Sequence, residues 1–356
     1  MLPELKTIQQ VRSDANSVAT VGPYQLRALL GSGGMGEVYL AEHRLLKRRC
    51  ALKQIRVERS RDPDAIARFE GEAQAMGRLT HPNTVEIYDY GTTDEGEFYY
   101  VMEFLPGLSL QDTVDRTGPL PVGRVIHLLR QVCAALREAH GCGMVHRDIK
   151  PANIFAAERG GIFDFAKLLD FGLVKSMQSP ADLTITREGL VLGSPLFAAP
   201  ELAVDEREVD HRADIYSLGA TAYFLLTGRP VFAGESPLRV ALAHAQQAPA
   251  LLSEFRNDIP AVLEAIVLRC LAKSPEDRFA SVAKLEAALA ACACEHPWAQ
   301  EQAERWWQDA VDFTSGPATS AIDPLAETSI AAANTATAPE QPTRAAGAQE
   351  GRHDSH

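Results

Sequence analysis

The most specific pattern in this chain is the loop HRDIKPAN (residues 146–153), followed seventeen residues later by DFG (residues 170–172). In such a loop a carboxylate can orient a hydroxyl group and accept its proton, and a lysine can neutralise a moving phosphoryl group. An amide oxygen combined with the DFG carboxylate gives the usual set of protein ligands for Mg²⁺. The two motifs at this spacing therefore indicate phosphoryl transfer.

A glycine-rich loop, GSGGMGEV (residues 31–38), lies upstream between two strand-like segments. Glycines allow the backbone to turn sharply and bring its N–H groups against phosphate oxygens. A dinucleotide-binding fingerprint would need a helix after its glycines, whereas GEVYLAEH (residues 36–43) alternates like a strand. The loop is therefore either a hairpin that covers phosphates or a plain hairpin.

Glu72 is a charge that needs a partner. A helix is predicted from Asp62-Pro63 onward, because a capping residue precedes a proline at the first helical position. Its apolar stripe consists of Ile66, Phe69, Ala73, Met76 and Leu79, and Glu72 falls inside that stripe. A carboxylate facing a core is costly unless it is paired, and Lys53 in CALKQI (residues 50–55) is the natural partner. The alternative is a glutamate at the edge of the stripe that reaches solvent.

The pattern of apolar and polar residues differs between two parts of the chain. The first part is strand-like, in YQLRALL (24–30), GEVYLAEH (36–43), RRCALKQI (48–55), TVEIYDYG (84–91) and EFYYVMEFL (97–105). From Gly107 the pattern becomes helical, most clearly in residues 121–143, 213–228 and 261–273. We therefore expect an N-lobe over 22–105, rich in strands with one helix, and a mainly α-helical C-lobe over 106–295. A ligand cleft is expected at their joint, residues 103–107.

The ends differ from this body. Residues 1–21 lack periodicity and are predicted to be a flexible leader. Residues 296–313 contain the tryptophans and are predicted to form an amphipathic helix, which either docks on its own domain or binds a partner. Residues 314–356 are rich in Ala, Thr and Pro and have few large apolar side chains, so we expect a disordered tail.

Composition excludes several classes of protein. The 356 residues carry a formal net charge of −12, which argues against binding nucleic acid through its phosphates. No segment approaches the ~20 apolar residues of a membrane-spanning helix, and the start resembles no secretory signal. Six scattered cysteines form no disulfide framework. We expect a reduced, cytoplasmic protein without a membrane segment.

Taken in order, the motifs resemble those of the eukaryotic-type protein kinases, specifically the bacterial (Hanks-type) serine/threonine branch. The resemblance covers about residues 22–285 and includes APE (residues 199–201) and ADIYSLG (residues 213–219). It implies an α+β, two-lobed protein-kinase fold. It also implies a serine/threonine protein kinase that transfers the γ-phosphoryl group of ATP, with Mg²⁺, to protein hydroxyl groups in bacterial signal transduction.

The resemblance also implies a role for each matching residue. Asp148 would be the catalytic base, and Lys150 would stabilise the transferred phosphoryl group. Asn153 and Asp170 would ligate Mg²⁺. ATP would be bound by the glycine-rich loop (Gly31, Ser32, Gly33, Gly34, Gly36), by Lys53 with Glu72, by Val38 and Ala51 around the adenine, and by Met102, Glu103 and Leu105. Asp214 would anchor the backbone of the catalytic loop, and Glu201 would pair with Arg278.

Regulation is a further hypothesis. The lysine of DIKPAN (148–153) is similar to the serine/threonine form of the family, and Ser194 keeps a hydroxyl group in GSPLFAAPE (193–201). Arg147 could pair with a phosphate on Thr184 or Thr186, so we expect autophosphorylation there. The alternative is that these threonines merely belong to a flexible loop.

The expected partners are protein substrates with serine or threonine, and a second copy of the chain in a homodimer for trans-autophosphorylation. Neither nucleic acid nor a membrane is expected as a partner, and the activating signal would be intracellular or come through a binding partner. Two rival functions are a pseudokinase scaffold and a small-molecule phosphotransferase. The first fits badly because Lys53, Asp148 and Asp170 are all present, and the second because the segment ending at Glu201 resembles a peptide-docking platform.

Overall fold

The structure is a computed structural model that describes residues 9–10, 19–33, 36–55, 71, 73–93, 96–171, 195–203, 209–294 and 296–313. Gly34, Glu72, Thr184, Thr186 and Ser194 lie outside these ranges, as do residues 56–70, where the predicted helix begins, and the tail over 314–356. Residues 73–76 are helical, and Ala73 and Met76 are buried as the stripe requires. Within these ranges, no helix has both the length and the apolar character needed to cross a membrane.

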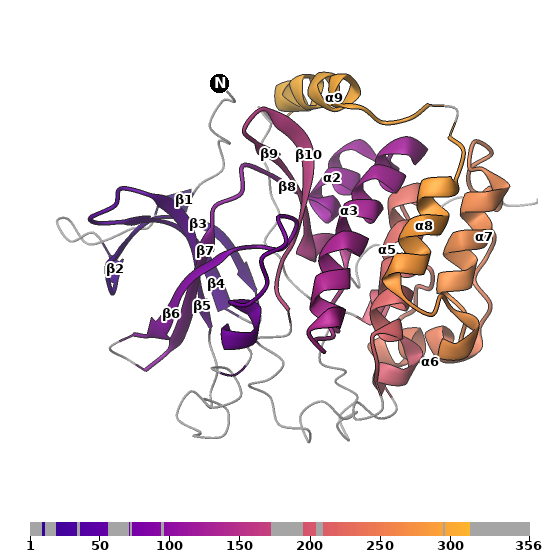
Figure 1. Ribbon diagram of the computed structural model, residues 1–356, viewed down its shortest axis with the longest axis horizontal. Helices are drawn as coiled ribbons and strands as arrows, with labels where there is room; N and C mark the ends of the chain where they lie inside the picture. The colour runs from indigo at the N-terminus through magenta and orange to yellow at the C-terminus, as the bar shows by residue number, and fades with distance from the viewer. Residues whose placement is uncertain are drawn as a thin grey trace, which may run out of the picture.

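The N-lobe is built on an antiparallel sheet. Its main strands are β3 (Tyr24–Gly33), β4 (Gly36–His43), β5 (Arg49–Ile55), β7 (Phe98–Glu103) and β6 (Ile87–Thr92), which are neighbours in that order. Each coincides with a strand predicted from the alternating pattern. The sheet lies beside the helical lobe, and the chain crosses between them after β7 (Figure 1).

Two short strands add to the outer side of β3. These are β1 (Gln9–Gln10) and β2 (Thr20–Val21), and both pair with β3 in antiparallel register. We expected a flexible leader over 1–21, and these four residues depart from that expectation. The physical reason is that β3 is otherwise an edge strand whose N–H and C=O groups can accept a further strand.

The C-lobe combines a small sheet with helices. The sheet contains β8 (Gly107–Ser109), β9 (Ile154–Arg159) and β10 (Ile162–Leu168). The helices are α2 (Leu110–Thr117), α3 (Val122–Gly141), α5 (Arg212–Thr227), α6 (Pro237–Gln246), α7 (Ala261–Cys270) and α8 (Val282–Ala291). Residues of α5 from Ala213 to Thr227 are all buried, since this helix is mainly apolar around its circumference and lies at the centre of the lobe. The two-lobed protein-kinase fold is thus confirmed.

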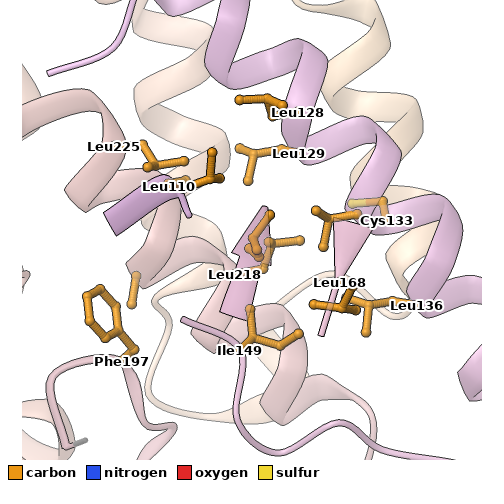
Figure 2. Packing of buried hydrophobic residues seen from close by; sticks show 14 of the residues in the cluster. Leu110, Leu128, Leu129, Cys133, Leu136, Ile149, Leu168, Phe197, Leu218 and Leu225 are labelled. Carbon is orange, nitrogen blue, oxygen red and sulfur yellow. The ribbon is translucent and has the colours of Figure 1, made fainter. Parts of the chain in front are cut away.

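The main core joins the helices to the loops that carry the charged motifs. Ile149, from the loop after α3, and Leu168, at the end of β10, are each 1% exposed or less. Figure 2 shows both among leucines of α3 and α5. Burying each side chain contributes about 2 kcal/mol. The loops are therefore held by apolar anchors that lie next to Asp148 and close to Asp170.

The tryptophan-containing segment docks on its own domain. Helix α9 (Gln300–Phe313) lies beside the β9–β10 hairpin (Figure 1). Trp298 and Trp307 each donate an indole N–H to Asp164, at 2.7 and 2.8 Å. Arg124 of α3 bonds the same carboxylate at 2.8 and 2.7 Å, and its guanidinium lies 3.6 Å from the ring centre of Trp306. Of the two roles considered for this helix, the structure shows the first.

Candidate active site

The loop after α3 is held by one buried carboxylate. Asp214 of α5 accepts the backbone N–H groups of His146 and Arg147, both at 2.8 Å, and Nε2 of His140 lies 2.8 Å from its Oδ2. Asp214 is fully buried, and Arg147 has a left-handed φ of 63°. Such a conformation is uncommon outside glycine and is often found at functional sites. The role of anchor expected for Asp214 is thus confirmed.

Asp148, Lys150 and Asn153 lie together on this loop. The Asn153 amide nitrogen donates to the backbone oxygen and to Oδ2 of Asp148, both at 2.9 Å. The Lys150 ammonium lies 3.4 Å from the same Oδ2. The Asp148 side chain is 16% exposed and that of Lys150 is 21% exposed, so both can reach a bound substrate. A carboxylate beside an ammonium group can orient a hydroxyl group and counter phosphate charge.

Asp170 faces this loop from the end of β10. Its Oδ2 lies 2.6 Å from the ammonium nitrogen of Lys53, and its Oδ1 accepts a hydrogen bond from the Tyr100 hydroxyl. Asp170 also has a left-handed φ, of 55°. The segment is tied to the catalytic loop because Nε2 of His146 lies 2.9 Å from the oxygen of Leu169, and the His146 ring packs against Phe171.

These contacts determine the protonation states of Asp170 and Tyr100. Burial alone would raise the pKa of the Asp170 carboxyl, but the Lys53 charge and the bonds from Lys53 and Tyr100 outweigh it and lower that pKa. Burial raises the pKa of Tyr100 well above its usual value, and the Asp170 charge adds to this. Asp170 is therefore an anion and Tyr100 a neutral donor at physiological pH.

One face of the N-lobe sheet carries the expected nucleotide residues. In the register, Val38 of β4 is opposite Lys53 of β5, and Ala51 is opposite Met102 of β7. Directly opposed residues share a face, and so do residues two positions apart on one strand. Tyr100, opposite Lys53, belongs to the same face. Sequence reasoning missed Tyr100, although its position two residues before Met102 was a usable signal.

The described residues of the glycine-rich loop lie on the paired ends of β3 and β4. Gly31 pairs with Val38, Ser32 with Glu37 and Gly33 with Gly36. Gly36 has φ 133°, and a Cβ there would lie 2.0 Å from the backbone oxygen of Gln54. The close approach of β5 therefore requires glycine at this position.

The joint between the lobes is fixed by a buried ion pair. Glu103, 8% exposed at the end of β7, pairs with Lys167 of β10, which is 1% exposed. The Glu103 N–H donates to the oxygen of Glu86 at 3.0 Å, and Lys167 also donates to the oxygen of Thr84 at 3.1 Å. Leu105 follows in the half-buried segment that leads into β8. Sequence reasoning considered only the backbone of Glu103 and missed this side-chain contact.

The donor atoms suit a divalent cation. Because the Asn153 nitrogen donates to Asp148, its amide oxygen points away from Asp148. Asp170 supplies an anionic carboxylate that is 26% exposed. A carboxylate and an amide oxygen are the ligand types that Mg²⁺ uses together with phosphates and water. Asn153 and Asp170 therefore fit the expected metal.

The remaining expected contacts divide into two groups. Arg278 bonds Glu201 through two parallel contacts of 2.6 and 2.8 Å, which confirms that pair. Lys53 and Glu72 stay a prediction, because Glu72 lies outside the described residues. Gly34, Thr184 and Thr186 stay predictions for the same reason.

The site and fold agree with known proteins. A family model described as the protein kinase domain matches residues 24–299. The chain is 42% identical over 275 residues to the serine/threonine-protein kinase Pkn1 of Myxococcus xanthus, covering 77% of this chain and 39% of that protein. It is 39% identical over 269 residues to PknB of Mycobacterium tuberculosis, covering 75% of this chain and 42% of that protein. The chain thus spans less than half the length of these two relatives.

Solved structures give the same result. The crystal structure of the Mycobacterium tuberculosis PknI kinase domain is 32% identical with a TM-score of 0.60, covering 78% of this chain and 99% of that one. The crystal structure of Rad53 1-466 in complex with AMP-PNP is 26% identical with a TM-score of 0.59, covering 72% and 62%. By the extent of the family match and the identity to its relatives, this chain belongs to the protein kinase family.

Proposed function

We propose that this chain transfers the γ-phosphoryl group of ATP to serine or threonine hydroxyl groups of proteins. The observation that carries the proposal is the convergence of Asp148, Lys150 and Asn153 from one lobe with the Lys53–Asp170 pair that crosses to the other. Its curated relatives are named serine/threonine-protein kinases, and one structural neighbour is a complex with AMP-PNP, an ATP analogue.

The chemistry assigns a task to each group. Asp148 orients the acceptor hydroxyl and takes its proton, while Lys150 counters the charge of the moving phosphoryl group. Lys53 and the backbone of the Gly31–Gly36 hairpin hold the phosphates, with Val38, Ala51 and Met102 next to the base and the backbones of Glu103 and Leu105 along its edge. Mg²⁺, when held by Asp170 and Asn153, neutralises phosphate charge.

A phosphorylation assay tests the proposal. The chain is incubated with radiolabelled ATP, MgCl₂ and a protein acceptor, and the labelled amino acids are identified after hydrolysis. Asp148→Asn is expected to lower the rate by about 10²- to 10⁴-fold, because the proton acceptor is lost. Asp258→Asn, at a 63% exposed carboxylate in the C-lobe, is the matched control and should leave the rate unchanged.

Two outcomes would contradict the proposal. Protein label that survives Asp148→Asn would discredit the assigned mechanism. No protein label from the unaltered chain would favour a scaffold or a phosphotransferase that acts on small molecules, and ATP consumption with a small-molecule acceptor would separate those two.

We also propose that the chain phosphorylates itself on Thr184 or Thr186, in trans within a homodimer. Arg147 directly precedes Asp148, and a phosphate on the segment could form about one to three charge-assisted bonds with such cationic groups. Mass spectrometry after incubation with MgATP is expected to find the modification. An unmodified segment in an active enzyme would refute it.

The proposed location is the cytoplasm. ATP, the proposed donor, is abundant there, and the six cysteines are free thiols, which suits a reducing compartment. Fractionation of cells that express the chain would test this, and recovery with the membranes would contradict it.

A further inference from the structure

Tyr100 is a buried side chain next to the reacting groups whose hydroxyl the proposed mechanism does not use. It is 1% exposed and lies on β7, and its hydroxyl donates to Oδ1 of Asp170. The other carboxylate oxygen, Oδ2, lies 2.6 Å from the Lys53 nitrogen. The two N-lobe donors therefore hold one oxygen each and fix the plane of the carboxylate.

The strand register brings both donors to this carboxylate. Tyr100 and Lys53 are directly opposed on β7 and β5, with the Lys53 nitrogen 5.8 Å from the centre of the Tyr100 ring. They reach Asp170 from across the cleft, whereas His146 and Asn153 hold the adjacent Leu169 from the C-lobe side, at 2.9 Å each. Only the Tyr100 and Lys53 contacts act on the carboxylate itself among the bonds described for Asp170.

We propose that Tyr100 is a positioning residue for Asp170, orienting its carboxylate to receive the divalent cation. The inference rests on the proposed function, because it takes Asp170 as a metal ligand. An oxygen that accepts one hydrogen bond keeps a second lone pair for a cation. Residues that hydrogen-bond a metal ligand in this way typically change metal affinity by about 10- to 100-fold when they are altered.

A hydroxyl deletion separates positioning from packing. Tyr100→Phe keeps the ring that fills the core and removes only the bond to Asp170. Tyr216→Phe is the matched control, because Tyr216 is equally buried and its hydroxyl lies 2.8 Å from Nδ1 of His244, in the C-lobe. Both variants lose one buried hydrogen bond, but only the first loses a bond to Asp170.

The measurement is ADP binding by calorimetry, with MgCl₂ and with EDTA. The ratio of the two affinities gives the coupling between metal and nucleotide without any catalysis. For Tyr100→Phe we expect this coupling to fall by about 10- to 100-fold while the affinity in EDTA stays unchanged. In assays of activity, the MgCl₂ concentration for half-maximal rate should rise correspondingly. Tyr216→Phe should show the coupling of the unaltered chain.

The outcomes that overturn the inference are distinct from those that overturn the function. Unchanged coupling in folded Tyr100→Phe, with clear coupling in the unaltered chain, would overturn this inference alone. No coupling in the unaltered chain would overturn the proposed Mg²⁺ site as well. If Tyr100→Phe does not fold, 3-fluorotyrosine at position 100 keeps the hydroxyl. Its fluorine resonance must then shift when MgCl₂ is added to the ADP complex, and an unmoved resonance would refute the role.

Discussion

Asp164 and Asp170 lie six positions apart in the chain, and their surroundings are built from the same parts. Both have a left-handed backbone, with φ 53° and 55°. Each carboxylate accepts hydrogen bonds from a cationic side chain and from an aromatic donor. For Asp164 these are Arg124 with Trp298 and Trp307, and for Asp170 they are Lys53 with Tyr100.

The two carboxylates differ in the lobe that supplies their donors and in their exposure to solvent. Asp164 is fully buried, and its donors all belong to the C-lobe and the helix segment docked on it. Asp170 is 26% exposed, and its two donors come from the opposite lobe. An enclosed, fully bonded carboxylate can only hold structure together, whereas a half-open one can also receive a cation. Exposure, rather than the type of partner, therefore distinguishes Asp164 from Asp170, the proposed ligand of the cation.

The largest effect is expected from Asp170→Asn. The amide cannot supply the anionic oxygen that the proposed cation needs, so the phosphorylation rate should fall by about 10³-fold, which corresponds to about 4 kcal/mol. The melting temperature should also fall, because the buried Lys53 ammonium loses the anionic partner described for it, but by less than in Asp164→Asn, because the Asp170 carboxylate is 26% exposed. If Asp170→Asn keeps its phosphorylation rate but has a far lower melting temperature, the roles assigned to Asp164 and Asp170 are contradicted.

The opposite pattern is expected from Asp164→Asn. Arg124 would be left in the core with no anionic partner, which should lower the free energy of unfolding by about 4 kcal/mol in urea titrations. Below its melting temperature the variant should keep most of its phosphorylation rate. If instead the stability is unchanged and the rate collapses, Asp164 is more than a structural clamp.

A pH titration distinguishes Asp170 from an enclosed histidine, His244. Its Nε2 faces the oxygen of Leu196 at 3.0 Å, and its Nδ1 faces the Tyr216 hydroxyl. Burial, aided by the Lys273 charge, lowers the pKa of His244 from 6.5 to about 4. As pH falls from about 6.5 to 4, only the unfolded chain takes up this proton, so stability should drop by about 3 kcal/mol.

Asp170 does not titrate in that window, because its pKa is already below its usual value of 3.8. His244→Asn should therefore flatten the stability curve between pH 6.5 and 4. A variant with the same slope would show that another group carries the effect. Urea titrations at a series of pH values measure the slope directly.

The smallest effect is expected from Trp307→Phe. It removes one of the donors to Asp164 and should cost about 2 kcal/mol in unfolding free energy, because the bond is to a charged group. The coupling between Mg²⁺ and ADP should not change. Tyr100→Phe also removes a bond to a charged group, so it should cost a similar free energy of unfolding, and it should in addition lower the coupling between Mg²⁺ and ADP. Equal coupling in the two variants would mean that exposure does not separate the two sites.

The sequence predicted the elements well where the pattern was local. The strands from Tyr24 to Glu103 and helix α3 follow from periodicity, whereas α5 and α7 follow from the length of their apolar runs. The loop with Asp148 and Asn153 was found because its residues are adjacent in the chain. The apolar stripe likewise anticipated that Ala73 and Met76 would be buried.

The contacts that the sequence could not provide join distant parts of the chain. Tyr100 and Asp170 are 70 residues apart, and Trp307 and Asp164 are 143 residues apart. A tyrosine on an apolar strand is expected to be core whether or not its hydroxyl has a partner. To infer that the Tyr100 hydroxyl has a partner, one needs the strand register together with the position of β10. The pairing of Gln9–Gln10 with β3 was hidden for a similar reason, since polar residues on an edge carry no periodic signal.

The Glu103–Lys167 pair has a mechanical consequence. It joins the last residue of β7 to the strand that leads to Asp170, and both side chains are nearly inaccessible to water. Separating the two side chains would leave each charge unpaired in a low-dielectric interior. Breaking the pair therefore costs free energy. A rotation of one lobe against the other that kept this contact would have to bend the chain on either side of it. The pair would then act as the fixed point of such a rotation.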